Sequence, residues 1–227
     1  MKQMRMSTLL AAFVTGTAIT SAMAAPELVH RWSFNGDYND SIGGTAATMI
    51  GSAVGFNDGN TAVVMSGAGN STGSLNLGVD MLPTDVPEVT VEMWFTHNGI
   101  KNWARLFDFG QNDQNYFVLT LCQGSDGKDR IEIKKANATL FATDNSMTPY
   151  AIGTPYHVSI TFRAFSDGAT EIRWMRRDVT TGVIEHAGSV IVPNWTIGSI
   201  TSPNCYIGHS QYTGDHDANA TYDEFRV

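Results

Sequence analysis

The amino-acid sequence predicts an all-β protein built as a two-layer antiparallel sandwich. Short runs of β-branched and aromatic residues recur along the chain, separated by clusters of Gly, Asn, Asp and Ser, which is the pattern of strands joined by turns. Few segments repeat apolar residues at helical spacing. The chain also begins and ends in strand-like runs, and roughly a dozen short strands without helices favour a sandwich over a closed barrel.

The expected strands follow one another in chain order, each bounded by turn residues. They cover residues 29–34, 45–50, 61–66, 74–78, 89–96, 104–109, 116–122, 130–134, 156–162, 171–176, 206–208 and 220–227. The run 89–96 alternates most clearly, so its odd-numbered residues from Val89 to Phe95 are expected to face the core. Turns at residues 166–168 and 180–182 are expected to close hairpins, because each contains Gly between two strand-like runs.

Residues 1–24 have the composition of a secretory signal peptide. Lys2 and Arg5 form a basic start, residues 8–21 form a short apolar run, and Ala-Met-Ala at 22–24 fits a cleavage site. A membrane anchor would need about 20 apolar residues, and Thr and Gly interrupt this run. The sequence therefore predicts a secreted or surface-displayed protein with a signal of bacterial style, whose mature part, residues 25–227, is one domain.

The mature chain is acidic. Removing Lys2 and Arg5 from the 14 basic residues leaves 12 against 22 acidic residues, a net charge of −10. Such a surface repels nucleic acid and anionic membranes, so neither is an expected partner, and no membrane insertion is expected. About 200 residues can bury one substantial core, which agrees with a single domain.

The two cysteines, Cys122 and Cys205, lie in apolar strand-like runs and allow two interpretations. In an exported chain they could form a disulfide, which in the chain-entropy model contributes about 4 to 5 kcal/mol. They could equally be two buried free thiols that pack as small hydrophobic residues. The sequence leaves both open, because it does not place the two Cβ atoms.

Five short segments, met in family order, resemble laminin G-like domains of the concanavalin A-like superfamily. They are residues 30–41, an opening strand with an Asp-Ser turn; 89–95, a central strand that ends in Glu-Met-Trp-Phe; 155–160, Pro-Tyr-His-Val-Ser-Ile; 206–208, Tyr-Ile-Gly; and 222–227, a closing strand. The resemblance implies a jelly-roll β-sandwich of two curved antiparallel sheets, with one concave face and ligand-binding loops. The chain departs from the family in a longer hairpin at 171–186. It also ends several residues before relatives do, which would fit a fragment of a larger surface protein.

The two ends of the chain carry the candidate metal ligands. The closing strand needs a partner, and pairing with the opening strand would bring Asp223 and Glu224 near the acidic turn that holds Asp37, Asn39 and Asp40. Relatives often hold a structural calcium ion near this junction, so the resemblance implies calcium bound by Asp37, Asn39, Asp40 and Asp223; oxygen donors suit that ion. The alternative is that these side chains cap turns by accepting backbone hydrogen bonds.

The expected partner is a glycan or an extracellular protein, bound by loops of the sandwich. Flat aromatic side chains with polar neighbours suit sugar rings, and Trp103 and Tyr212 are the candidate ligand-binding residues, because both lie in loop-like segments. Two other loop aromatics, Trp195 and Tyr150, could instead pack against the sandwich. The tryptophans within strands are expected in the core; they are Trp32, Trp94 and Trp174.

Two charged clusters are expected to be solvated surface. The loop with His209, Asp215, His216 and Asp217 matches no zinc motif, although its Tyr212 could line a binding rim. Three arginines near the end of one strand form a local basic patch, and a solvated strand face is the better interpretation of it; they are Arg173, Arg176 and Arg177.

Catalysis is not expected. Retaining glucanases of this fold place carboxylates on one strand face as E-x-D-x-x-E or E-x-D-x-E, and neither pattern occurs. Glu88 and Glu92 share a face, but Thr90 stands where the central carboxylate would be.

The leading hypothesis is a non-catalytic recognition domain. One alternative is a structural or adhesive module that self-associates through sheet edges, such as the terminal strand, or assembles with other proteins. The other is a glycan-active enzyme with unrecognised carboxylates.

Overall fold

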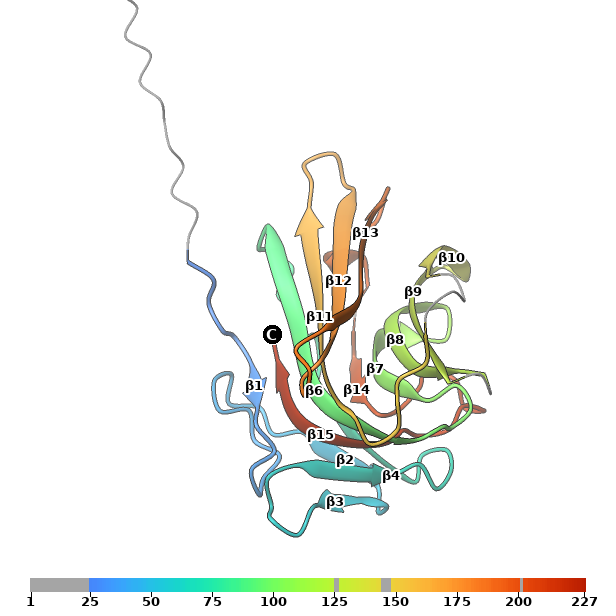
Figure 1. Cartoon of the computed structure of the whole chain (residues 1–227). Helices are drawn as coiled ribbons and strands as arrows, with labels where there is room; N and C mark the ends of the chain where they lie inside the picture. Colours follow the sequence, from blue (N-terminus) through green and yellow to red (C-terminus); the bar gives the residue numbers. More distant parts are fainter. Residues whose placement is uncertain (1–24, 125–126, 144–147, 201) are drawn as a thin grey trace, which may run out of the picture.

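The computed structural model describes residues 25–227 apart from 125–126, 144–147 and 201, and it shows a jelly-roll sandwich of two antiparallel sheets (Figure 1). The all-β prediction is confirmed. The predicted signal peptide, residues 1–24, lies outside the described residues. Within the described ranges, the chain forms no helix with the length and apolar character of a membrane span.

The strands are short and follow the turn pattern of the sequence. They are β1 (Arg31–Trp32), β2 (Thr48–Gly51), β3 (Val54–Phe56), β4 (Val63–Ser66), β5 (Gly73–Asn76), β6 (Glu88–Gly99), β7 (Arg105–Asn112), β8 (Asn115–Gln123), β9 (Lys128–Lys135), β10 (Ala138–Ala142), β11 (Pro155–Ala164), β12 (Thr170–Asp178), β13 (Ile184–Val192), β14 (Asn204–Ile207) and β15 (Asn219–Arg226), with a 3-10 turn η1 (Ile197–Ser199). Both predicted hairpins are present, and each uses a left-handed glycine, Gly168 between β11 and β12 and Gly182 between β12 and β13.

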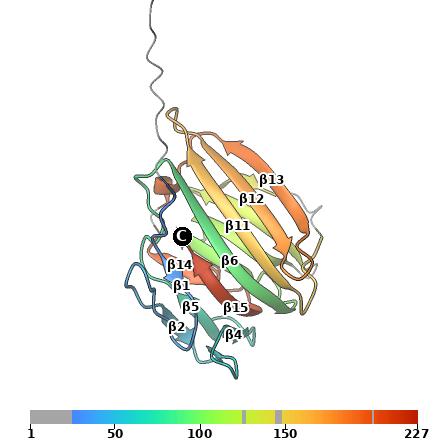
Figure 2. The ribbon, with the colours of Figure 1, turned by 60° about the vertical axis from the view of Figure 1, so that its left-hand side comes forward.

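In each sheet the long strands lie side by side and most short strands gather at one end. The eight-stranded sheet has the order β13-β12-β11-β6-β15-β4-β3, with β1 also pairing to β15. Figure 2 shows β13, β12, β11, β6 and β15 side by side in this sheet. The seven-stranded sheet has the order β10-β9-β8-β7-β14-β5-β2. Its strands β7, β8 and β9 carry the candidate functional site.

The two ends of the chain pair as predicted. Arg31 lies opposite Arg226 and Trp32 lies opposite Phe225 in an antiparallel register. The last strand is nevertheless not an exposed edge, because β15 also pairs with β6 on one side and with β4 on the other. The expectation that the terminal strand is free to pair with another chain is therefore wrong. The end strands of the described sheets are β13, β3, β10 and β2.

The core fills the space between the sheets with the inward-facing residues of every long strand. The odd-numbered residues of the central strand β6, from Val89 to Phe95, are buried as predicted. Phe162 of one sheet meets Phe117 of the other edge to face, with ring centroids 4.6 Å apart. Such aromatic pairs contribute about 0.5 to 1.5 kcal/mol beyond the area that they bury.

The tryptophans divide differently from the prediction. Trp32 is fully buried as expected, and Trp174 is partly buried against the core. Trp94 is not in the core: it lies on the outer face of the eight-stranded sheet, stacked on His157 at 4.1 Å and under Arg226 at 4.7 Å. Strand alternation is the reason, since the neighbours Met93 and Phe95 already point inward. The loop aromatics Trp195 and Tyr150 are buried and pack in the core.

A buried ion pair joins the sheets. Arg176 of β12 and Asp129 of β9 point between the layers, with Arg176 Nη1 at 3.3 Å from Asp129 Oδ2 and side-chain exposures of 3% and 2%. Arg176 also donates to the backbone oxygen of Thr148 at 2.8 Å and contacts Glu185 at 3.1 Å. The predicted solvated arginine patch is thus wrong for Arg176, because alternation turns it inward.

The cysteines are free and buried, so the disulfide interpretation is wrong and the free-thiol alternative holds. Cys122 lies on β8 and Cys205 on β14, and β7 runs between these strands. Two strand spacings amount to about 9.5 Å. A disulfide needs Cα atoms no more than about 7 Å apart, so the fold holds these residues too far apart to bond.

Candidate functional site

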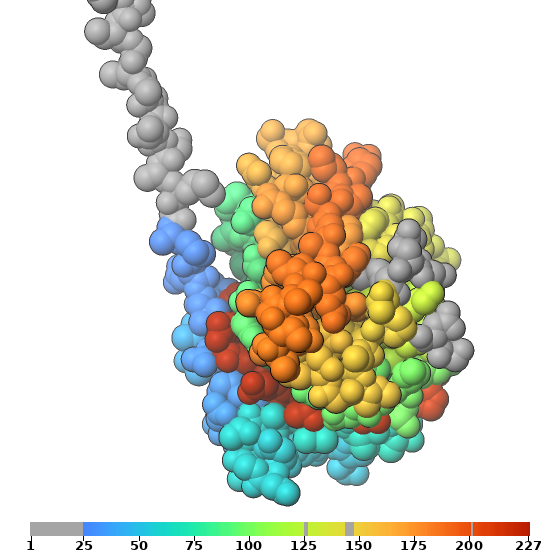
Figure 3. All heavy atoms as spheres, viewed as in Figure 1, coloured from blue at the N-terminus to red at the C-terminus, as the bar shows by residue number. Residues whose placement is uncertain are grey.

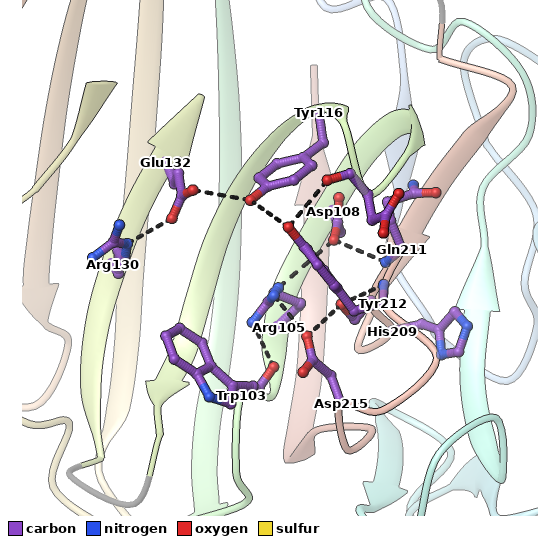
Figure 4. Close-up of polar contacts among 12 residues, drawn as sticks. Trp103, Arg105, Asp108, Tyr116, Arg130, Glu132, His209, Gln211, Tyr212 and Asp215 are labelled. Carbon is purple, nitrogen blue, oxygen red and sulfur yellow. Dashed lines mark hydrogen bonds and ion pairs between the residues drawn. The ribbon is translucent and has the colours of Figure 1, made fainter. Parts of the chain in front are cut away.

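The candidate site lies on the outer face of the seven-stranded sheet. Along β9, Asp129, Ile131 and Ile133 are buried, whereas Arg130, Glu132 and Lys134 alternate with them and turn outward. The neighbouring strand β8 places Tyr116 opposite Lys134. Strand β7 adds Arg105 and Asp108 to the same face, and the loop of residues 209–215 crosses over it (Figure 4).

Tyr212 holds this loop to the sheet. Its hydroxyl accepts a hydrogen bond from Lys134 Nζ at 2.9 Å and donates one to the backbone oxygen of Asp113 at 3.0 Å. The Tyr116 hydroxyl is 3.4 Å from the Tyr212 hydroxyl, and the two rings meet edge to face at 5.9 Å. Lys134 Nζ lies 5.5 Å from the centre of the Tyr212 ring and 5.9 Å from that of Tyr116. The two rings and the ammonium therefore form one aromatic and cationic surface.

Arg105 joins the two predicted ligand-binding residues. Its guanidinium lies 5.7 Å from the ring centre of Trp103 and 6.0 Å from that of Tyr212. Nη1 donates to the backbone oxygen of Trp103 at 2.6 Å, and Nη2 donates to Asp215 Oδ2 at 2.7 Å. Trp103 adopts a left-handed conformation with φ of 56°, which costs energy for a large side chain and is held by this contact. Trp103 and Tyr212 therefore lie in one cluster, as Figure 4 shows.

Asp108 lies beneath the loop and is fully buried. Its Oδ2 accepts the backbone N–H of Gln211 at 3.1 Å and is 3.6 Å from Arg105 Nε. Its Oδ1 has no hydrogen-bond partner among the described residues. Burial raises the pKa of Asp108 to about 6, even though Arg105 opposes the rise. Burial also raises the pKa of Asp215, again against Arg105.

Glu132 is the third carboxylate of this face, and it accepts hydrogen bonds from three side chains. It accepts the Tyr116 hydroxyl at 2.9 Å, Arg130 Nε at 2.7 Å and the Thr139 hydroxyl at 3.4 Å. Burial, together with the nearby Tyr212 hydroxyl and the Glu132 charge, raises the pKa of Tyr116. Tyr116 therefore stays a neutral donor at physiological pH.

Most residues of this site escaped the sequence analysis, which singled out only Trp103 and Tyr212. The missed side chains are Arg105, Asp108, Tyr116, Arg130, Glu132 and Lys134. A signal for three of them was present, because charged residues alternate with isoleucines along β9. The contribution of Arg105 depends on a cross-strand neighbour and a distant loop, which periodicity within one strand does not reveal.

The polar loop cluster predicted from the sequence separates into two roles. Asp215 joins Arg105 at the candidate site. His209 Nδ1 instead lies 2.7 Å from Asp217 Oδ1, and Asp217 Oδ2 accepts the backbone N–H groups of Thr72 and Gly73. Burial alone would raise the pKa of Asp217, but these hydrogen bonds keep that pKa below its ordinary value. This half of the loop anchors the chain.

The predicted calcium ligands do not form a metal site in this arrangement. Asp40 Oδ1 accepts three backbone N–H groups, from Arg31, Ile42 and Gly43, and Oδ2 lies 2.6 Å from His30 Nδ1. A Cβ atom at Gly43 would come within 2.3 Å of His30 Nδ1, so this close approach requires glycine. Within the described ranges, no three His, Cys, Asp or Glu side chains lie close enough together to hold a metal ion.

The other three predicted ligands, Asp37, Asn39 and Asp223, are solvent-exposed. Asp37 Oδ1 caps a turn by accepting the backbone N–H of Asn39. Asp223 is solvent-exposed at an irregularity in β15, and it is Glu224 that meets the opening strand, through Arg31 Nε at 2.5 Å. Turn capping, the alternative raised by the sequence, therefore describes Asp37 and Asp40.

Glu92, which could not be assigned to a carboxylate motif, lies on the opposite side of the molecule from the candidate site. It contacts His157 Nε2 at 3.3 Å on the outer face of the eight-stranded sheet. The proximity of His157 lowers the pKa of Glu92. Glu88 is exposed at the start of the same strand.

Comparison with known proteins shows the fold. No protein-family description matches the chain, and no curated protein matches its sequence. Among solved structures, it is similar to domain 4 of an extracellular GH43 arabinanase, AbnA from Geobacillus stearothermophilus, in complex with arabinotriose. The TM-score is 0.57 and the identity 19%, over 88% of this chain and 91% of that domain. At this identity the match establishes a shared sandwich fold.

Two further similar structures have lower scores. One is the CBM40 domain of the Ruminococcus gnavus IT-sialidase bound to α2,3-sialyllactose, with a TM-score of 0.49 and 12% identity over 73% of this chain and 88% of that one. The other is arcelin-5, a lectin-like defence protein of Phaseolus vulgaris, with a TM-score of 0.48 and 11% identity over 79% and 91%.

Proposed function

We propose that this protein is a secreted or surface-displayed, non-catalytic, laminin G-like domain that binds a glycan. The binding surface is the outer face of β7, β8 and β9 together with the loop of residues 209–215. The observation that carries the proposal is the cluster of Trp103, Tyr212 and Tyr116 around Arg105 and Lys134. Aromatic rings offer flat faces for sugar rings, and the interleaved donors suit sugar hydroxyls.

The similar arabinanase domain supports this proposal, because that domain was solved with a bound arabinotriose. The exported location follows from the predicted signal peptide, residues 1–24, and places residues 25–227 where extracellular glycans occur. Calcium is not part of the proposal, because the residues predicted to bind it are engaged in hydrogen bonds or lie apart.

A glycan array followed by calorimetric titration of the best ligand tests the proposal. Tyr212→Ala should weaken binding at least about tenfold, because it removes both the ring and the anchor of the loop. Trp94→Ala is the matched control, since Trp94 is a half-buried tryptophan on the opposite sheet. Absence of glycan binding by the folded protein, or turnover of the bound glycan, would contradict the proposal.

A second candidate function, self-association, is favoured by one observation. Strand β13 ends the eight-stranded sheet, runs for nine residues without Lys or Pro, and exposes Ile184 and Ile191 by 56% and 60%. The orange side chains of the β12 and β13 region lie at the surface in Figure 3. A long unprotected end strand is a template for pairing with another chain. Light scattering of the wild type and of Ile191→Lys would show whether such pairing occurs.

A further inference from the structure

We propose that the ligand of this face is a carboxylated glycan, a chain containing uronic acid, and that Lys134 and Arg130 bind its carboxylate groups. This inference rests on the proposed glycan-binding function and specifies its ligand class. It depends on which charges of the face are already paired within the described structure and which are not.

Lys134 is the first cation with unused capacity. Its ammonium donates to the Tyr212 hydroxyl at 2.9 Å and lies beside the rings of Tyr212 and Tyr116. Among the described residues it has no carboxylate partner, although an ammonium carries three donors. Arg105, by contrast, is committed to Trp103, Asp215 and Asp108.

Arg130 is the second cation with unused capacity. Its Nε donates to Glu132 at 2.7 Å, and its two Nη groups make no hydrogen bond or ion pair with the described residues. The side chain is 22% exposed. A guanidinium fork matches the planar geometry of a carboxylate, so the free Nη edge suits that group better than it suits a single hydroxyl.

The carboxylates of the face accept donors from within the cluster itself. Glu132 accepts three donors, Asp215 accepts Arg105 and Ser210, and Asp108 is completely buried. The unpaired groups turned toward solvent are therefore donors with positive charge, in a protein whose mature net charge is −10. The three cations of the face balance its three carboxylates, so a carboxylate of the ligand meets free charged donors here, whereas the net negative charge of the protein repels it elsewhere.

The spacing of the two cations indicates a polymer with repeated carboxylates. Lys134 and Arg130 are four residues apart on one strand face, which corresponds to about 13 Å. They are therefore too far apart to share one carboxylate and would contact different sugar units. Tyr212 supplies a ring beside Lys134, where one sugar unit can pack.

Titration with matched oligosaccharides tests this inference. The probes are oligomers of galacturonate, glucuronate and mannuronate, each paired with its carboxyl-reduced, neutral counterpart. We expect at least one uronate to bind about 10- to 100-fold more tightly than its reduced form, the range for a charge-assisted hydrogen bond. Lys134→Gln should remove most of that preference. Lys135→Gln is the matched control, since it changes the same charge at the adjacent residue of β9.

Each other outcome overturns the inference and separates it from the proposed function. Equal binding of the neutral counterpart would leave glycan binding intact and remove the carboxylate assignment. Equal losses in Lys134→Gln and Lys135→Gln would show a diffuse charge effect. If a glycan that carries sulfate but no carboxylate binds as tightly as any uronate, the site recognises anions in general and not carboxylates in particular. Failure of every uronate, with a neutral glycan bound on the array, refutes only the ligand class, whereas no glycan binding at all refutes the proposed function.

Discussion

Replacing Asp129 by Asn should remove about half of a loss of stability that the wild-type protein shows as the pH rises from about 4 to 7. Burial between the sheets raises the pKa of Asp129 to about 6, although Arg176 opposes the rise from 3.3 Å. The folded state thus holds this proton at pH values where the unfolded chain, with an ordinary pKa of 3.8, has released it. Stability therefore falls as the pH rises through this window.

The size of the effect follows from the difference between the two pKa values. About two units correspond to about 3 kcal/mol in total, of which about 2 kcal/mol falls between pH 4 and pH 7. Asp108, whose pKa is also raised to about 6, adds a second contribution of the same sign. The lowered pKa values of Asp40, Asp217 and Glu224 act in the opposite direction, but that stability is lost only below about pH 4, as these groups become protonated.

Urea unfolding of the mature chain between pH 4.5 and 7.5 measures this effect. Asp129→Asn should flatten the pH dependence over this range by about 2 kcal/mol relative to the wild type. Arg176 keeps its contacts with Thr148 and Glu185 in this variant, so the amide leaves no isolated buried charge. Asp58→Asn, in an exposed turn, is the control. A wild-type stability that increases with pH, or identical slopes in wild type and Asp129→Asn, would refute the reasoning.

Four further predictions concern structural residues and calcium. Asp40→Ala should lower the free energy of unfolding by about 3 kcal/mol, because it leaves three backbone N–H groups and His30 without their acceptor. Neither calcium nor chelator should shift the melting temperature of the wild type. A rise in the melting temperature with calcium would restore the metal hypothesis. Thiol titration of the unfolded protein without reductant should detect both Cys122 and Cys205, and a single disulfide found by mass spectrometry would contradict the fold. Phe162→Ala should lower the free energy of unfolding in urea by about 3 to 5 kcal/mol, because the residue is 2% exposed and its ring packs against the opposite sheet. A decrease of less than about 1 kcal/mol would show that this contact is unimportant.

The fold was largely predictable because its determinants are local. Alternation identified the core face of β6, glycine turns identified both hairpins, and the terminal strands had the composition to pair. The missed strands β3 and β10 are short and carry little apolar alternation. Trp94 was misplaced because its hydrophobicity indicated the core while its position on the strand placed it outside, and the position prevailed.

The candidate site was only partly predictable because it is assembled across strands. Lys134 and Arg130 share a strand, but Tyr116 joins them through the register of β8 with β9, and Tyr212 reaches them from a loop far along the chain. The same alternation rule places Lys134 on the surface and Asp129 in the core, so a charged residue in a strand reveals its role only when its neighbours on both sides are considered. Applied to residues 128–135, that test separates the outward Arg130, Glu132 and Lys134 from the inward Asp129. The surface that we propose for glycan binding and the ion pair between the sheets are thus the two faces of one strand.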